Sequence, residues 1–126
     1  MKKMIIDTHI HIWNLEKVRY DWLDGDTSIL NCTYMFEELL PEIAASPVAS
    51  GILVQAANNL EDTDLMLNTV RRHQEITGIV GWLPLMKPDK VHTLLKERFL
   101  QTPYFKGVRH LIHNESDTKW LLQSEV

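Results

Sequence analysis

The sequence predicts an α/β protein built on a parallel sheet. Short apolar runs alternate with segments of helical periodicity along the 126 residues, which is the order typical of strands connected by helices. The apolar runs are nearly continuous, as expected for strands of a parallel sheet that helices cover. The length suits one domain with an adequate core. We therefore expect a β-loop-α unit followed by further β-α units.

The first predicted strand covers residues 4–13 and carries two histidines two positions apart. Side chains of a strand alternate between two faces, so one face should pack as core while the other gathers imidazole and carboxylate groups. The polar face comprises Asp7, His9, His11 and Trp13, and the core face comprises Ile6, Thr8, Ile10 and Ile12. The polar face is where chemistry is expected.

A loop without periodicity is expected over residues 14–31. Loops of this length are uncommon and often functional, although Tyr20 and Trp22 within it could equally well cover the core. A helix should follow over residues 33–45, with Thr33 as its N-cap. Pro41 should break or kink that helix, because proline cannot donate a backbone hydrogen bond.

The rest of the chain predicts three more strands, each followed by a helical segment. The strands are expected at residues 49–57, 79–85 and 105–112. The best-marked helix begins after Asn59, a good N-cap followed by acidic residues, and should end at Gly78. A further helix is expected over residues 89–100, and another should begin near residue 117.

The composition favours a soluble, cytoplasmic protein. The net charge is −4 and no basic run occurs, so neither nucleic acid nor a membrane is expected as a partner. Cys32 is the only cysteine, which excludes an intrachain disulfide and fits a reducing compartment. No apolar run approaches the ~18 residues of a membrane span. No glycine-rich phosphate-binding pattern occurs, so no nucleotide is expected.

His9 and His11 are the strongest candidates for a functional site. Two imidazoles on one face of a strand can converge on one divalent ion or on one anionic substrate oxygen. Neutral imidazole suits zinc, iron or nickel. The alternative is a pair of histidines that are hydrogen-bonded in a core or at the edge of a sheet.

Arg109 lies in the fourth apolar run, where an unpaired cation would be costly. It should therefore face a solvated substrate pocket or form a structural ion pair with Asp7 or a helix acid. Its planar guanidinium suits a carboxylate or a developing oxyanion. Gln55 and Trp82 end the second and third strands, where a barrel places its active site, and they could bind substrate or fill the barrel mouth.

The remaining histidines, the cysteine and the serines give no further candidates for a functional site. His73, His92 and His113 have no partner in the pattern and are expected in solvent. Cys32 has no histidine pattern beside it and is expected to be inert. No serine-centred nucleophile elbow occurs.

Six separated motifs occur in one order along the chain: Ile6-Asp-Thr-His-Ile-His-Ile-Trp13, Tyr20-Asp-Trp-Leu23, Gly51-Ile-Leu-Val-Gln-Ala56, Gly78-Ile-Val-Gly-Trp-Leu83, Phe105-Lys-Gly-Val-Arg-His110 and Trp120-Leu-Leu122. Together they resemble the amidohydrolase-related (amidohydrolase 2) sugar-lactone hydrolases, a group that includes 2-pyrone-4,6-dicarboxylate lactonase-like enzymes. The resemblance covers nearly the whole chain.

The resemblance implies a TIM-like (β/α)8 barrel with the two histidines at the end of its first strand. Such a barrel takes roughly 250 residues, so residues 1–126 are expected to form a single partial domain, the N-terminal half with about four βα units. The further histidine of the family, and the aspartate that acts as general base, are expected downstream of Val126.

The resemblance also implies a function, the opening of a lactone ring of a sugar acid or a related small carboxylated ring. His9, His11 and Arg109 would be catalytic, with the two histidines as ligands of one divalent metal ion such as zinc. Some members of the group work without a metal, so the ion is left open. The substrate-binding residues would be Gln55, Trp82, Tyr20 and Trp22.

Two other functions stay open. One is a metal-dependent decarboxylase of the same superfamily. The other is a non-catalytic fragment that pairs with a partner half or with itself as a homo-oligomer, since an open half-barrel would leave sheet edges and apolar faces uncovered.

Overall fold

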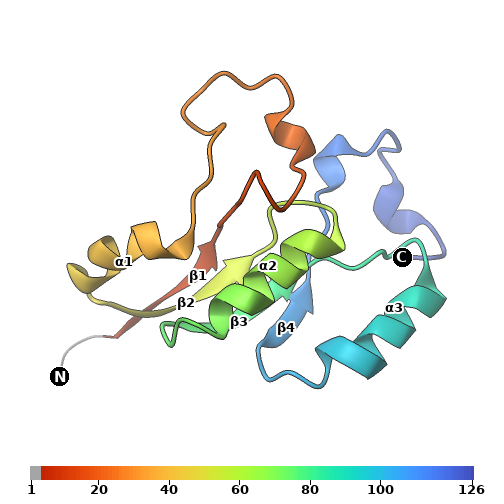
Figure 1. Ribbon diagram of the computed structural model, residues 1–126. Coiled ribbons are helices and arrows are strands. Elements are labelled where there is room, and N and C mark those ends of the chain that lie inside the picture. The colour runs from red at the N-terminus through yellow and green to blue at the C-terminus, as the bar shows by residue number, and fades with distance from the viewer. Residues whose placement is uncertain (1–3) are drawn as a thin grey trace.

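A computed structural model describes residues 4–126 of the chain (Figure 1). It contains one parallel sheet of four strands in the order β1-β2-β3-β4. The strands are β1 (Ile5–Ile10), β2 (Val48–Val54), β3 (Ile76–Gly81) and β4 (Phe105–Val108). The predicted α/β class with four parallel strands is therefore confirmed.

The helices follow the strands in sequence. They are α1 (Phe36–Ala44), α2 (Leu60–Val70) and α3 (Pro88–Leu94), which continues as a π-helical turn, Leu95–Phe99. Figure 1 shows α2 lying across β2 and β3. The core lies between the sheet and these helices and includes three fully buried side chains, Phe36, Leu53 and Phe99.

The opposite face of the sheet is partly uncovered. A Cβ atom added at Gly81 would contact Thr63 of α2, so Gly81 lies on the face of the sheet that α2 covers. A Cβ atom added at Gly78 would contact Ile52 and Lys106 instead. Gly78 therefore lies on the opposite face, away from α2. Ile6 is 57% exposed and Val108 is 38% exposed. The expectation that Ile6 and Thr8 pack in the core is therefore wrong, because both are exposed, while Ile10 and Ile12 are buried as predicted.

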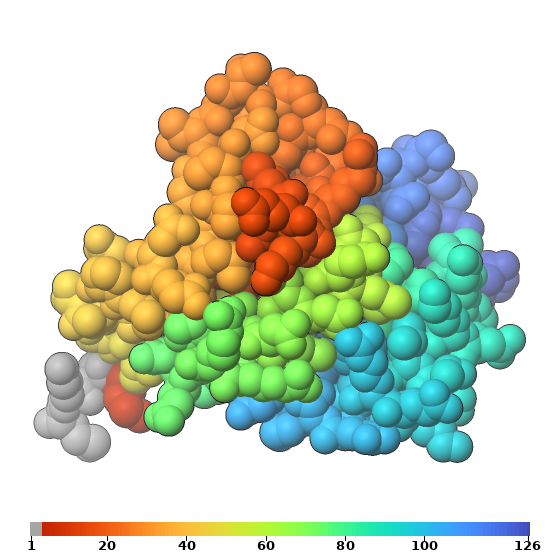
Figure 2. Space-filling model, viewed as in Figure 1, coloured from red at the N-terminus to blue at the C-terminus, as the bar shows by residue number. Residues whose placement is uncertain are grey.

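The long segment after β1 stands above the sheet. Figure 2 shows residues near 20–35, in orange, as a lobe that projects from the body formed by the strands and helices. Its base is closed by a two-way backbone bridge between Trp13 and Tyr34, with both N···O distances at 2.9 Å. A short 3-10 turn, Asp21–Leu23, is the one helical element of this segment.

Several predicted boundaries are wrong. The second helix ends at Val70 rather than at Gly78, because a turn at residues 71–75 separates it from β3. The β-branched Ile76 begins that strand and is almost fully buried. β4 ends at Val108, so Arg109 follows the strand instead of lying within it. The predicted last helix is a single 3-10 turn, Trp120–Leu122.

The first helix also differs from its prediction. Met35 is its N-cap, and the Thr33 hydroxyl instead accepts a hydrogen bond from the Leu15 amide at 3.0 Å. The helix runs through Pro41 without a break. Proline removes the N–H that would bond the carbonyl of Glu37, but Glu37 is exposed, so water can satisfy that carbonyl.

The predicted cap of α2 is confirmed. The Asn59 side-chain oxygen accepts from the Asp62 amide at 2.9 Å. Replacing Asn59 by alanine should lower the free energy of unfolding by about 1 kcal/mol, as for other N-cap losses, measured by urea denaturation. Asn68→Ala is the control, because Asn68 is exposed within the same helix and alanine should be neutral or slightly stabilising there. Equal effects of the two substitutions would contradict a capping role.

Within residues 4–126, the helices are all too short or too polar to cross a membrane.

Candidate active site

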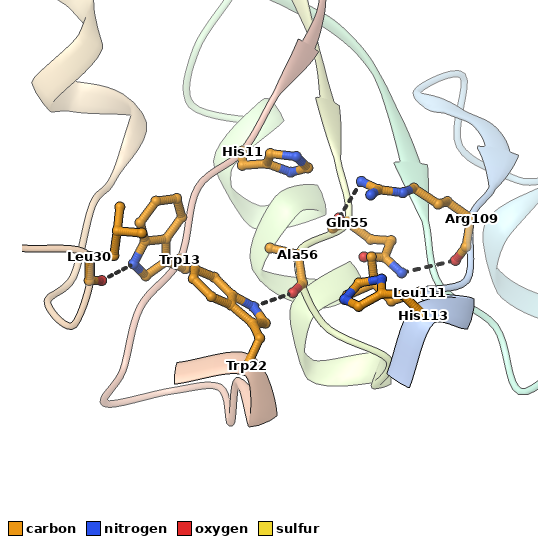
Figure 3. A pocket seen from close by; sticks show the side chains of 9 residues that line it. All are labelled: His11, Trp13, Trp22, Leu30, Gln55, Ala56, Arg109, Leu111 and His113. Atoms are coloured by element: carbon orange, nitrogen blue, oxygen red, sulfur yellow. Dashed lines mark hydrogen bonds between the residues drawn. The ribbon is translucent and has the colours of Figure 1, made fainter. Parts of the chain in front are cut away.

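A pocket of about 340 Å³ lies beyond the carboxyl ends of the strands (Figure 3). Its walls come from the long segment after β1 and from the residues that follow β2 and β4. The lining residues are His11, Trp13, Trp22, Leu30, Gln55, Ala56, Arg109, Leu111 and His113. This is the end of the sheet where (β/α)8 barrels carry their active sites.

The two histidine rings meet at this end of the sheet. The Nε2 atoms of His9 and His11 are 3.0 Å apart, and the rings form an edge-to-face pair. His11 Nδ1 lies 2.9 Å from the carbonyl oxygen of Val54. Because that carbonyl can only accept, Nδ1 carries the proton, and the His11 Nε2 lone pair faces His9 Nε2 as a hydrogen-bond acceptor. Partial burial lowers the pKa of His11 against the opposing effect of the Val54 carbonyl, and His9 and Arg109 lower it further.

This arrangement fits half of a zinc site. Zinc–nitrogen bonds of about 2.0–2.1 Å at a tetrahedral angle hold two nitrogen atoms about 3.3 Å apart. The observed Nε2···Nε2 distance of 3.0 Å is close to that value. Metal-bound histidines commonly donate their second ring N–H to a carbonyl, as His11 does to Val54. No group of three or more His, Cys, Asp or Glu side chains suited to a metal occurs in residues 4–126.

Arg109 extends its side chain along the pocket toward His11 and Gln55 (Figure 3). Its Nη1 atom donates to the Gln55 carbonyl at 3.3 Å, and its own carbonyl accepts from Gln55 Nε2 at 3.1 Å. Among the described residues, no carboxylate forms an ion pair with Arg109. The guanidinium therefore keeps donors available for an anionic or carbonyl ligand.

Gln55 is fully buried and its amide orientation is fixed. Nε2 donates to two carbonyl-type oxygens, Asn58 Oδ1 and Arg109 O, both at 3.1 Å. The Oε1 atom has no hydrogen-bond partner. A buried acceptor without a donor costs roughly 1–3 kcal/mol. Because Oε1 is itself buried, it is out of reach of a ligand in the pocket, and Gln55 contributes to the site by holding Arg109.

Two tryptophans form the apolar wall of the pocket. Trp13 and Trp22 meet edge-to-face with their ring centroids 5.5 Å apart. The Trp22 indole donates to the Ala56 carbonyl at 2.8 Å, and the Trp13 indole donates to the Leu30 carbonyl at 3.2 Å. Both rings are thus held in place by backbone acceptors (Figure 3).

Two of the predicted substrate contacts, Tyr20 and Trp82, are absent from the residues that line the pocket. Tyr20 is buried, and its hydroxyl donates to Asp62 Oδ1 at 3.4 Å. The Trp82 indole donates to His110 Nδ1 at 2.9 Å. His110 Nε2 lies 2.7 Å from Glu115 Oε1. His9 is likewise absent from the lining and contacts it through His11.

Five residues that line the pocket are outside the predicted site, namely Trp13, Leu30, Ala56, Leu111 and His113. His113 was expected in solvent; it is exposed, yet it lies at the pocket because the chain turns back after β4 in the 3-10 turn Ile112–Asn114. The expectation for His73 is wrong, since its ring is largely buried against Phe36 and bonded to Glu37 at 2.9 Å. His92 is exposed as expected.

Two of the curated proteins similar to this chain are named L-fucono-1,5-lactonase. The chain is 26% identical to L-fucono-1,5-lactonase of Burkholderia multivorans over 94% of its length and 39% of that protein. It is 29% identical to an uncharacterized protein of Sinorhizobium fredii over 97% of its length and 45% of that protein. No protein-family model matches. The chain thus spans about two-fifths of the length of these relatives.

Solved structures match the fold. An amidohydrolase of Burkholderia multivorans with bound zinc superposes with a TM-score of 0.78 at 26% identity, over 98% of this chain and 43% of that one. A second crystal form of that amidohydrolase, with bound HEPES, superposes with a TM-score of 0.81 at 24% identity, over 98% of this chain and 42% of that one. The chain is therefore amidohydrolase-like, and its four parallel strands with three α-helices correspond to part of a TIM-like barrel.

Proposed function

We propose that this chain belongs to a hydrolase that opens the lactone ring of a sugar acid or a related small carboxylated ring. The observation that carries the proposal is the convergence of His11, Arg109 and Gln55 on one pocket at the carboxyl ends of three parallel strands. The names of the similar lactonases support the reaction type. The partly uncovered sheet face supports a requirement for further barrel units in the active protein.

Ring opening is the addition of water to an ester carbonyl followed by cleavage of the bond to the ring oxygen. Arg109 donates to the carbonyl oxygen, where negative charge develops, and holds it against the His11 side of the pocket. The ring oxygen leaves with a proton as the alcohol, and the product is a hydroxy acid. Gln55 holds Arg109 in place through the two hydrogen bonds between these residues, and the tryptophan wall contacts the ring.

His9 and His11 would hold one zinc ion, which when bound would polarise the ester carbonyl. His11 is prepared for this role because its Nδ1 bonds to the Val54 carbonyl, which leaves Nε2 on the side of His9. The remaining ligands and the general base that activates water are expected downstream of Val126.

The proposal can be tested on the product of the whole reading frame that encodes these residues. The purified protein is supplied with zinc, and hydrolysis of a panel of sugar-acid lactones is followed by proton release. We expect turnover of at least one lactone. Loss of turnover on adding a chelator would show that the metal is required, and unchanged turnover would show that it is not. His92→Ala is the matched control for His11→Ala, because His92 is exposed and outside the pocket.

Two results would overturn the proposal. The first is the absence of turnover across the panel. The second is release of carbon dioxide from a carboxylated substrate without lactone hydrolysis, which would favour a decarboxylase.

A further inference from the structure

Three hydrogen bonds connect the long segment after β1 to the β2–α2 turn and to the first turn of α2. The Asn59 side-chain amide donates to the Arg19 carbonyl at 2.9 Å. The Tyr20 hydroxyl donates to Asp62 at 3.4 Å, and the Trp22 indole donates to the Ala56 carbonyl at 2.8 Å. The long segment, which supplies Trp22 to the pocket wall, is therefore held in place through three of its residues, Arg19, Tyr20 and Trp22.

Asp62 lies at the centre of these contacts and is fully buried. Its Oδ2 atom accepts from the amides of Ala56 and Ala57 at 2.8 and 3.3 Å, while Oδ1 faces the Tyr20 hydroxyl. An acidic residue at the third position of a helix usually bonds back to the N-cap amide. Asp62 occupies that position in α2 but bonds the residues before the cap, so helix capping does not account for its contacts.

The Ala56 peptide connects Asp62 to the pocket wall. Its N–H is held by Asp62 and its carbonyl by the Trp22 indole, and both Ala56 and Trp22 line the pocket. A shift of this peptide would therefore move the acceptor that orients the Trp22 ring.

We propose that Asp62 is a positioning residue that sets the Trp22 wall of the pocket through the Ala56 peptide and the Tyr20 hydroxyl. Its consequence for substrate binding rests on the proposed function, whereas its effect on Trp22 does not.

The surroundings of Asp62 support a role beyond stability. A buried carboxylate without a cation is costly, and such groups concentrate at functional sites. The titratable group that faces Asp62 from the long segment is Tyr20, whose pKa is raised by burial, so the phenol stays protonated as a donor. The nearby Arg19 is bound at the surface to Asp21 and Asp24. From the β2–α2 turn, Asp62 meets backbone N–H groups.

The test measures hydrogen exchange of the tryptophan indole N–H groups by NMR, with the Trp22 signal assigned from Trp22→Phe. In Asp62→Ala the Trp22 indole should exchange about tenfold faster, as expected from the loss of a hydrogen-bonded anchor. The Trp82 indole bonds His110 outside this network and should keep its protection. Asp62→Asn should restore much of the Trp22 protection, because its amide oxygen can accept the same N–H groups. Glu61→Gln, at an exposed position in the same turn, should change neither signal.

An unchanged Trp22 signal in Asp62→Ala would overturn the proposal. Equal loss of protection at Trp22 and Trp82 would also overturn it, because that pattern indicates general destabilisation. In the active protein, Asp62→Asn should leave kcat within about twofold while Asp62→Ala raises KM by about tenfold, the pattern expected for lost binding without lost transition-state contacts. A protein that turns over no lactone would defeat the proposed function but leave the indole measurement valid.

Discussion

Replacing Arg109 by alanine should lower kcat/KM for lactone hydrolysis by about 100- to 1000-fold, the range seen when one donor to a developing oxyanion is removed. Among the described residues, its guanidinium is the cationic side chain that lines the pocket, and it forms no ion pair there. The loss should fall mainly on kcat, because the carbonyl oxygen gains its charge only in the transition state. Steady-state kinetics of the whole reading-frame product would measure it.

The control for Arg109 is Arg71→Ala, since Arg71 is exposed at the end of α2 and lies outside the pocket. Arg109→Lys should recover part of the activity, because lysine keeps the charge but loses the planar arrangement of donors. If Arg109→Ala raised KM with an unchanged kcat, Arg109 would be a ground-state binding residue and the proposed oxyanion role would be wrong.

The parts of the site at strand ends could be predicted from the sequence. His11, Gln55 and Arg109 lie toward the carboxyl ends of predicted strands, and the structure places each of them directly after its strand. The carboxyl ends of parallel strands meet at one edge of the sheet. The pocket brings these three together. Residues carried by irregular segments could not be predicted, because no periodicity fixes their direction. Tyr20 turns inward to Asp62, while Trp22, two residues later, lines the pocket.

The fold could be predicted at the level of element order but not of boundaries. Ile76 extends an apolar pattern that fits the end of a helix as well as the start of a strand, and the turn at residues 71–75 decides between them. Contacts between residues that are distant in sequence could also not be predicted. The contact of His73 with Glu37 joins residues 36 positions apart, and neither residue type nor spacing predicts it.

The stability of the protein should fall as Asp62 becomes ionised. Burial raises the pKa of Asp62 from 3.8 to about 6, against the opposing effect of its N–H donors. Between these two values the folded state binds more protons than the unfolded state, so the free energy of unfolding decreases as the pH rises. The stabilisation is complete below the unfolded-state pKa and is lost once the pH exceeds about 6. At 1.36 kcal/mol per unit of pKa, the loss from about pH 4.5 to about pH 7.5 is on the order of 2 kcal/mol.

Asp62→Asn isolates this contribution, since other groups titrate in the same range with the opposite sign. The lowered pKa of His11 makes the fold more stable as the pH rises through the ordinary histidine range, and the lowered pKa of Glu37 acts in the same direction at lower pH. The shifts at His11 and Glu37 are present in wild type and in Asp62→Asn alike, so they cancel in the difference between the unfolding free energies of the two proteins. Urea denaturation at about pH 4.5 and about pH 7.5 should therefore show wild type losing on the order of 2 kcal/mol relative to Asp62→Asn. A difference that stays constant, or that grows in favour of wild type as the pH rises, would mean that the carboxylate is stabilised in place by its N–H donors and that burial does not dominate its titration.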